Sequence, residues 1–291
     1  MQMISASFLA KALWGFEIGG SWGGSAAQVE MGYKLAMTFP VTFSLGALTI
    51  PAHLIFEMLS YFLGYHYYRY LRARQGDVLD DEGRIGVIVG GILGAAILSK
   101  LLGLLEHPEQ LRATQENLAF LVASKTIVGG LIGGLIGVEI AKKVMGISRS
   151  TGDLFCLPII LGMMIGRIGC FLQGASDGTW GHPTTWPTGM DGGDGVLRHP
   201  MPLYEIGILA LIWLLLVQLR SRLTLPEGHL FGLFMSFYLG WRLVADFMKP
   251  NSLVMPFGLS AIQIACLLTL TYYMWVFLRP TTRSAANDGN T

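Results

Sequence analysis

Arg167 is the residue whose type and surroundings most clearly indicate chemistry in this sequence. It lies in an apolar run that holds no other formal charge between Asp153 and Asp177. A charged side chain near a bilayer centre costs roughly 2.5 to 3.5 kcal/mol on insertion scales, so it persists where it lines a polar cavity or meets an anionic partner. A planar, permanently positive guanidinium in such a place suits a phosphate or a carboxylate. The alternative interpretation is a structural ion pair that joins two helices.

A second arginine, Arg242, lies in a later apolar run, with Tyr238 four residues before it and Asp246 four residues after it. Residues four apart share one face of a helix. The two arginines then have one evident acidic neighbour, which leaves about one positive charge unbalanced, and a bound lipid phosphate would balance it. Three glycines beside the first arginine would allow another backbone or a ligand to approach closely: Gly162, Gly166 and Gly169.

Candidate bases lie both in an apolar run and in a long loop. His53 and Glu57 are four residues apart, so the carboxylate could orient the imidazole and raise its basicity. The loop offers His182 and His199 as alternatives, and its Gly, Pro, Asp and Thr content indicates turns with free backbone polar groups. The other ionisable residues near ends of apolar runs are expected to snorkel or to sit at the boundary: Lys100, Lys125, Glu139 and Glu205.

The composition identifies the class of protein. Hydrophobic residues make up 52% of the chain and charged residues only 13%, whereas soluble domains contain about 25% charged residues. This indicates an all-α polytopic membrane protein, in which the net charge of +1 carries no information about partners. The three cysteines (Cys156, Cys170 and Cys266) lie in or beside apolar runs without metal spacing, so they predict packing residues and no metal site. No cofactor and no nucleic-acid partner are expected.

Seven runs are long enough to span a hydrocarbon core, which needs about 20 residues each. They are roughly 43–68, 85–105, 119–141, 154–173, 203–219, 229–248 and 258–278. We expect these helices to surround a lipid-binding cavity within one domain, 41–280, followed by a tail, 281–291. Residues 1–40 fit neither a signal peptide nor a spanning helix and are expected to be interfacial or an over-extended start. Repeated glycines four apart in the second and third runs predict close helix packing: Gly86, Gly90, Gly94, Gly129, Gly133 and Gly137.

The distribution of basic residues predicts the orientation. The segments after the first, third, fifth and seventh runs hold eleven Lys and Arg residues, with Arg84 counted in the first of them, and the opposite side holds five. The positive-inside rule therefore predicts a cytoplasmic C-terminus. It also places the longest loop, 173–201, outside the cytoplasm, directly after the Arg167 run.

Several motifs together resemble one known family, the bacterial prolipoprotein diacylglyceryl transferases. Gly166-Arg-Ile-Gly-Cys-Phe171, followed by Gly178, resembles that family's arginine signature. Arg198-His-Pro-Met-Pro-Leu-Tyr-Glu205 is similar to its His-Pro-x-Gln-Leu-Tyr-Glu motif, with Pro202 in place of Gln. The stretch 43–50 is similar to the turn into the family's first span, and 238–246 resembles its late Tyr-x-x-x-Arg-x-x-x-Glu helix, with Asp replacing Glu. The resemblance covers roughly residues 38–280.

This resemblance implies an enzyme of the bacterial inner membrane that moves the diacylglyceryl group of phosphatidylglycerol to the lipobox cysteine in the signal peptide of a prolipoprotein. A thioether forms and glycerol phosphate leaves. Arg167 and Arg242 would hold the lipid phosphate, while Tyr238 and Asp246 would position Arg242. Three further residues are expected to bind substrate: Gly169, Gly178 and Tyr204.

The sequence departs from the family pattern where a base is expected. The slot for the family's proposed catalytic histidine, before Gly129, holds Val128; the usual glutamate after the arginine signature is Ala175; and the usual Trp-Tyr-Gly of the first span is Ala52-His53-Leu54. We therefore expect His53 with Glu57 to take the thiol proton, with His199 and His182 as alternatives. Two other functions stay open: a non-catalytic phospholipid-binding member of the family, and a transporter for a lipid or organic anion.

Overall fold

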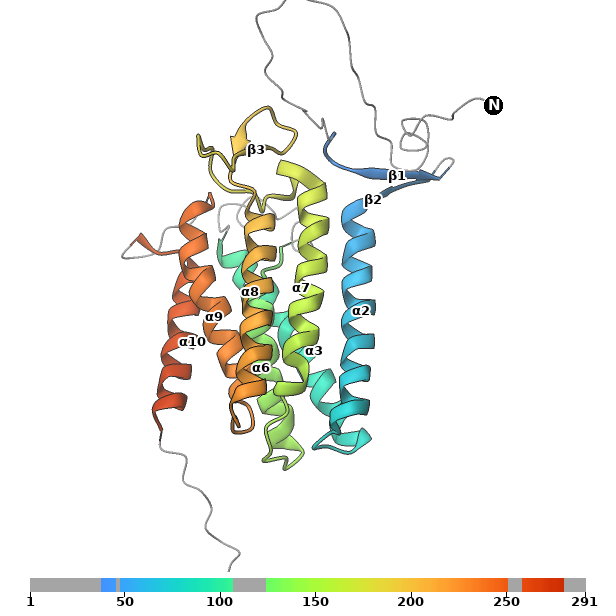
Figure 1. Ribbon diagram of the computed structural model, residues 1–291, viewed down its shortest axis with the longest axis vertical. Helices are drawn as coiled ribbons and strands as arrows, with labels where there is room; N and C mark the ends of the chain where they lie inside the picture. The colour runs from blue at the N-terminus through green and yellow to red at the C-terminus, as the bar shows by residue number, and fades with distance from the viewer. Residues whose placement is uncertain (1–37, 46–47, 107–123, 251–257, 280–291) are drawn as a thin grey trace, which may run out of the picture.

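The computed structural model describes residues 38–45, 48–106, 124–250 and 258–279, and this part of the chain folds into a bundle of seven α-helices (Figure 1). The helices are α2 (Ala52–Gln75), α3 (Asp81–Glu106), α6 (Ile127–Val144), α7 (Asp153–Gln173), α8 (Met201–Arg222), α9 (His229–Ala245) and α10 (Ala261–Leu278). Short 3-10 helices, η1 (Gly174–Asp177) and η2 (Asp246–Met248), extend α7 and α9. The all-α membrane fold expected from composition is therefore confirmed.

Two small antiparallel hairpins lie at one end of the bundle. Strands β1 (Thr42–Leu45) and β2 (Leu48–Pro51) pair directly before α2. Strands β3 (Met190–Asp191) and β4 (Leu197–Arg198) pair within the long segment between α7 and α8. This segment, 174–200, forms a cap that we call the head (Figure 1). The turn between α2 and α3 lies at the opposite end.

Local sequence explains where the helices begin and end. Pro51 closes strand β2 and directly precedes α2, since its fixed φ suits a helix start. Ser260 caps α10 through a reciprocal capping box with Gln263, which satisfies two backbone N–H groups that a helix start leaves free. Gly174 ends α7 with a φ of 74°, a conformation that favours glycine.

The first predicted span, 43–68, was placed too early. Residues 43–45 and 48–51 belong to the β1–β2 hairpin, and the helix runs over Ala52–Gln75. A short apolar run has the same hydropathy in a strand as in a helix, so hydropathy alone could not locate this boundary. The third predicted span, 119–141, corresponds to α6, and its residues 119–123 lie outside the described part. Residues 1–37 and the predicted tail 281–291 also lie outside it.

In the part of the chain that the structure describes, five helical segments are long and apolar enough to cross a membrane: Asp81–Glu106, Asp153–Asp177, Met201–Arg222, His229–Met248 and Ala261–Leu278. The remaining two long helices of the described chain, α2 and α6, pack inside the same bundle against α7 and α3. Helix α6 is apolar but carries three charged residues, Glu139, Lys142 and Lys143, whereas tyrosines, histidines and arginines lower the hydropathy of α2. The chain is therefore a multi-pass membrane protein.

Glycines bring α3 and α6 into backbone contact. A methyl group on Gly90 would come within 2.7 Å of the Gly137 carbonyl oxygen, and one on Gly94 would overlap the backbone of Gly133. The close packing predicted from the repeated glycines is therefore confirmed.

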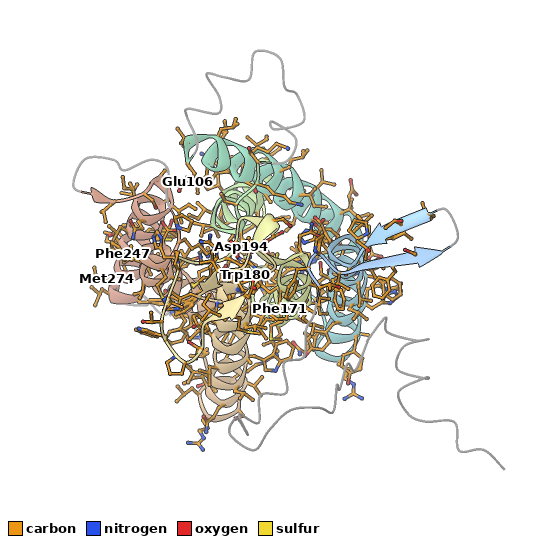
Figure 2. All side chains as sticks on the ribbon, turned by 90° about the horizontal axis from the view of Figure 1, so that it is seen from above. Glu106, Phe171, Trp180, Asp194, Phe247 and Met274 are labelled. Carbon is orange, nitrogen blue, oxygen red and sulfur yellow. The ribbon has the colours of Figure 1, made fainter. Side chains whose placement is uncertain are left out.

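The core of the bundle lies between α7, α8 and α9. In the membrane-spanning stretch within His229–Met248, 50% of the residues are buried inside the bundle. The side chains of Phe234, Tyr238 and Leu209 are fully enclosed. Seen from above, Trp180 of the head and Phe171 of α7 lie over the middle of the bundle (Figure 2). Their rings stack with centroids 5.8 Å apart, and the buried indole anchors the head on the helices.

Candidate active site

The two arginines singled out by the sequence meet at one buried carboxylate, Glu205. Arg167 Nη2 lies 2.9 Å from Glu205 Oε1 and 2.8 Å from Oε2, and Arg242 Nη1 lies 3.3 Å from Oε2. Glu205 is 1% exposed, and each arginine is 5% exposed. The three side chains come from α7, α8 and α9, each near the end of its helix that faces the head. A buried ion network therefore joins three helices beneath the cap.

Glu205 corrects the charge balance predicted from the sequence. Asp246 was expected to be the one acidic neighbour of the two arginines, whereas Glu205 contacts both of them and Asp246 lies 3.6 Å from Arg242 Nη2. The prediction of one unbalanced positive charge was therefore wrong. Sequence position alone suggested that Glu205 lay at a membrane boundary. The sequence signal for its role was its position: Glu205 is an acidic residue at the start of an apolar run, and the apolar runs before and after this one each contain an arginine.

Tyr238 acts on this network through the carboxylate. Its hydroxyl donates a hydrogen bond of 2.6 Å to Glu205 Oε1, so Glu205 connects Tyr238 to Arg242. Asp246 accepts a short hydrogen bond from the Ser260 hydroxyl. The predicted neighbours of Arg242 are thus both at the site, and Ser260 ties the site to the start of α10.

Both arginines retain unused hydrogen-bonding capacity. Within the described part of the chain, Arg167 Nε and Arg242 Nε are buried and have no hydrogen-bond partner. A buried donor without a partner is costly, about 1 to 3 kcal/mol, unless a ligand or water satisfies it. The site therefore combines two desolvated guanidiniums with free donors, as an anion receptor requires.

Lys249 also lies at this site, although its place in the sequence, directly after the sixth apolar run, gave no sign of such a position. It follows η2, and its side chain is half-buried near the two arginines. Burial, and then the positive charges of Arg242 and Arg167, lower the pKa of its ammonium to about 7. An anion bound beside it would favour the protonated form, because an opposite charge raises the pKa of an ammonium.

His53 and Glu57 lie on one face of α2, as their spacing predicted. His53 Nε2 is 3.8 Å from Glu57 Oε2, and Lys125 Nζ holds the same carboxylate at 2.6 Å. His53 Nδ1 is 3.4 Å from Asp177 Oδ1 of η1. Cys170 lies beside this histidine and also within 3.7 Å of Arg167 Nη1. The predicted base is therefore linked to the arginine site through Cys170.

His199 belongs to the head and lies close to Tyr204. Its Nδ1 is 3.3 Å from the Tyr204 hydroxyl, which in turn lies 2.5 Å from the Thr188 hydroxyl. His199 is 8% exposed and lines a pocket of about 700 Å³ in the head. The side chain of His182 is exposed, while its backbone N–H donates to the Met248 carbonyl at 2.8 Å and ties the head to η2.

The candidate glycines have two different environments. A methyl group on Gly169 would lie 3.0 Å from Phe56 Cβ and 3.2 Å from the His53 carbonyl oxygen, so this glycine allows α7 to approach α2. Gly178 is exposed and has a φ of 68°, which strains any side-chain-bearing residue. Val128, in the slot of the missing histidine, is 1% exposed in the apolar core of the bundle.

A polytopic helical bundle with a capped, buried arginine–carboxylate–arginine network at one end defines a multi-pass membrane protein with a candidate polar site. The family model for prolipoprotein diacylglyceryl transferase matches residues 40–279. The chain therefore belongs to the prolipoprotein diacylglyceryl transferase family, a family of transferases.

Individual relatives agree with the family model. Proteins named phosphatidylglycerol--prolipoprotein diacylglyceryl transferase from Nitrosomonas europaea and Cupriavidus metallidurans are each 31% identical to the chain, over 72% and 78% of its length and 77% and 85% of theirs. A protein of the same name from Methylococcus capsulatus is 35% identical over 63% of the chain and 69% of its own length.

Proposed function

We propose that this protein transfers the diacylglyceryl group of phosphatidylglycerol to the lipobox cysteine thiol of a prolipoprotein, in the inner membrane of a bacterial cell. The products are a thioether and glycerol phosphate. The observation that carries the proposal is the Arg167–Glu205–Arg242 network, because it gathers two buried guanidiniums with unused donors at one end of the bundle. The names of the relatives support the two substrates.

The arginines would act on the leaving phosphate. Displacement at the glyceryl carbon develops negative charge on the phosphate oxygen, and fixed donors in a dry site stabilise this charge more strongly than water does. Glu205 has a supporting part, since it holds both guanidiniums in place and offsets one of their two positive charges, while Asp246 offsets the other. The network is thus preorganised before the lipid binds.

Deprotonation of the acceptor thiol is the second requirement, because the thiolate is the nucleophile. His53 is the best-placed group for it, since Glu57 and Asp177 flank its two ring nitrogens and Cys170 connects it to Arg167. His199 is the alternative in the head, beside Tyr204.

One observation favours a second candidate, a family member that binds phospholipid without transferring it. Val128 occupies the slot of the family's histidine and is enclosed in the core. Because valine has no basic group, this residue cannot take the thiol proton. Such a protein would bind phosphatidylglycerol and leave a lipobox peptide unmodified.

A transfer assay with the purified protein separates these functions. Phosphatidylglycerol and a synthetic lipobox peptide are supplied in detergent or nanodiscs, and the peptide mass is followed. We expect the peptide to gain one diacylglyceryl group, and a peptide with serine in place of its cysteine to gain none. An unchanged cysteine peptide, together with saturable lipid binding, would overturn the transferase proposal in favour of the binding protein.

A further inference from the structure

Three side chains with metal-ligating atoms converge beside the arginine network, although they come from separate segments of the chain. They are His53 of α2, Cys170 of α7 and Asp177 of η1, and one ligand atom of each lies within 4.8 Å of the other two. The close approach of α7 to α2 at Gly169 brings the cysteine and the histidine together. Sequence spacing gave no indication of this cluster, and the sequence analysis predicted no metal site.

The geometry of the cluster fits a tetrahedral zinc site with one open position. Zinc binds His nitrogen and carboxylate oxygen at about 2.0 to 2.2 Å and Cys sulfur at about 2.3 Å, which places neighbouring ligand atoms about 3.5 Å apart. The Nδ1 of His53 and Oδ1 of Asp177 are already 3.4 Å apart. Among the described residues, this buried Nδ1 has no hydrogen-bond partner. The Cys170 sulfur lies within 4.8 Å of the other two ligand atoms, so it would move inward by up to about 1.3 Å to reach this spacing.

A carboxylate also lies on the other side of the His53 ring, where a metal-bound histidine normally has a hydrogen-bond acceptor. A ligating imidazole usually donates its other N–H to a carboxylate, which fixes the ring and raises its basicity. Here the other ring nitrogen, Nε2, faces Glu57 at 3.8 Å, and Lys125 fixes that carboxylate from the far side. The Thr179 hydroxyl donates to Asp177 Oδ2 at 2.5 Å and leaves Oδ1 for a ligand.

We infer that His53, Cys170 and Asp177 bind one zinc ion, whose open position accepts the thiol of the acceptor peptide; this inference rests on the proposed function. Mixed nitrogen, sulfur and oxygen ligands favour zinc over magnesium or calcium. The cysteine thiolate and the aspartate neutralise the dication, so it is compatible with Arg167 Nη1 at 3.7 Å from the sulfur. A bound acceptor thiolate then adds one negative charge beside that arginine.

The site would replace the base that is missing at Val128. A thiol loses its proton to solvent when it coordinates zinc, so with zinc bound His53 would be a ligand in place of the base proposed above, and no separate base would be needed. The sulfur of the zinc-bound thiolate forms a bond with the glyceryl carbon while the carbon–oxygen bond to phosphate breaks. The electron pair leaves with glycerol phosphate beside the arginines. The thioether product is a neutral, weaker ligand and dissociates.

Metal content gives a test that does not depend on activity. The purified protein is loaded with zinc, dialysed and analysed by elemental mass spectrometry, and a cobalt-loaded sample is examined for thiolate-to-metal charge transfer in the near ultraviolet. We expect one zinc per chain and the cobalt band in the wild type, and loss of both in Cys170→Ser and Asp177→Asn. Cys156→Ser is the matched control, because Cys156 lies on the same helix and its sulfur, 3.8 Å from the Leu230 carbonyl oxygen, can be replaced by a hydroxyl donor.

The same preparations are tested for diacylglyceryl transfer with and without a chelator, which separates the two proposals. Transfer by a protein without stoichiometric zinc, or zinc retained in Cys170→Ser, would overturn the metal site and leave the proposed function intact. Stoichiometric zinc that depends on Cys170 and Asp177, without transfer, would support the metal site and overturn the proposed function.

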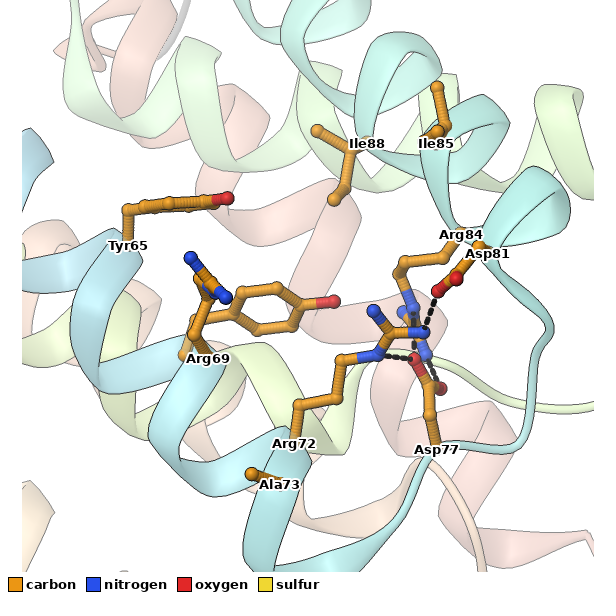
Figure 3. A pocket seen from close by; sticks show the side chains of 10 residues that line it. Tyr65, Arg69, Arg72, Ala73, Asp77, Asp81, Arg84, Ile85 and Ile88 are labelled. Carbon is orange, nitrogen blue, oxygen red and sulfur yellow. Dashed lines mark hydrogen bonds and ion pairs between the residues drawn. The ribbon is translucent and has the colours of Figure 1, made fainter.

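A second inference rests on a separate pocket at the opposite end of the bundle from the head (Figure 3). The pocket has a volume of about 640 Å³ and lies between the end of α2, the start of α3 and the turn joining them. Its lining contains three arginines and two aspartates: Arg69, Arg72, Arg84, Asp77 and Asp81. Tyrosines and isoleucines form the rest of the wall, apart from one alanine. The lining is thus apolar on one side and carries one excess positive charge.

Arg84 was expected in the segment after the first span, whereas it belongs to helix α3. It lies in the first turn of α3, is 2% exposed and pairs with Asp77, which also accepts a hydrogen bond of 2.8 Å from Arg72 Nε. Two buried polar atoms of the pocket lining, Arg84 Nη1 and the Tyr68 hydroxyl, have no hydrogen-bond partner within the described ranges. Both are donors, and a phosphate oxygen would satisfy them.

The geometry points to a binding site for a terminal phosphate group, carried by an anionic phospholipid or present as free inorganic phosphate. Ile85 is 63% exposed at the rim, so acyl chains could extend from the pocket along α3. This site is independent of the transfer reaction, because its residues lie at the other end of the bundle from the arginine–glutamate network.

Photolabelling distinguishes the two sources of phosphate. Phosphatidic acid with a photoreactive group near its phosphate is compared with a phosphatidylcholine analogue, and labelled peptides are mapped. We expect phosphatidic acid to label residues 65–88 several-fold more than the phosphatidylcholine analogue does. Tyr68→Phe and Arg69→Gln should each reduce this labelling. Tyr70→Phe, at a position outside the pocket lining, should leave it unchanged. Displacement of the label by millimolar inorganic phosphate would assign the pocket to free phosphate. Equal labelling by both lipids and all variants would overturn the site.

Discussion

Arg167 and Glu205 form a buried ion pair of 2.8 Å between α7 and α8, and Arg242 of α9 shares the same carboxylate at 3.3 Å. This pairing explains how two arginines persist within an apolar bundle. It also means that the network is held together without a ligand, so that under the proposed function structure and catalysis would depend on the same three side chains.

Replacing Glu205 with Gln should destabilise the protein strongly. The substitution leaves two buried guanidiniums without their shared carboxylate, and breaking a buried pair typically costs about 3 to 5 kcal/mol. Thermal unfolding in detergent should show a large decrease in Tm. Glu227→Gln is the matched control, because Glu227 pairs with Arg149 on the surface and should shift the Tm little. Equal Tm values for both variants would show that Glu205 does not hold the network.

His53→Gln should reduce turnover by about 10² to 10⁴, the usual contribution of a general base, with lipid binding nearly unchanged. Glu57→Gln should reduce it less, because Glu57 only orients the imidazole. Loss of zinc together with turnover would assign His53 as a ligand. Full activity in His53→Gln, with loss in His199→Gln or His182→Gln, would place the base in the head. Full activity in all three would leave the arginines as the sole catalytic groups.

Lys249 should make stability depend on pH. Its pKa is about 7 in the folded protein and about 10.4 in an unfolded chain, so between these values the unfolded chain holds more protons and stability rises with pH. Below about pH 7 this contribution is constant, because the lysine is protonated in both states. Lys249→Gln should remove the rise from a Tm series over about pH 6 to 10, whereas Lys143→Gln, an exposed lysine near the end of α6, should keep it. Parallel curves for the wild type and Lys249→Gln would contradict the assignment.

The orientation predicted from the basic residues can be tested by cysteine labelling. A membrane-impermeant reagent added outside should label a cysteine placed at Thr188, in the head, and fail to label one placed at Ala73 or Ser148. These two positions lie in the last turn of α2 and in the loop after α6, at the other end of the bundle. The reverse pattern would place the arginine network on the cytoplasmic side.

The sequence identified the arginines because a charge inside an apolar run is a strong signal, and Arg167 and Arg242 do lie at one site. Glu205 was missed because an acidic residue at a predicted helix boundary has the same sequence pattern whether it faces headgroups or is buried. The cluster of His53, Cys170 and Asp177 could not be predicted either, since packing of α2 on α7 brings the three together. The β1–β2 hairpin was taken for helix because hydropathy does not separate short apolar strands from helices.

The most direct test of the central claim is the rate of diacylglyceryl transfer by Arg167→Lys and Arg242→Lys, measured as the gain in mass of a lipobox peptide. Lysine keeps the charge that pairs with Glu205, so both variants should insert and purify as monodisperse proteins, but it cannot reproduce the planar fork of donors. We predict that each loses about 10² to 10³ in rate, the usual effect of removing a donor to a developing anion, while Arg149→Lys, at the surface, keeps the wild-type rate. Wild-type rates in both folded lysine variants would contradict the account and leave the two arginines as a structural ion pair.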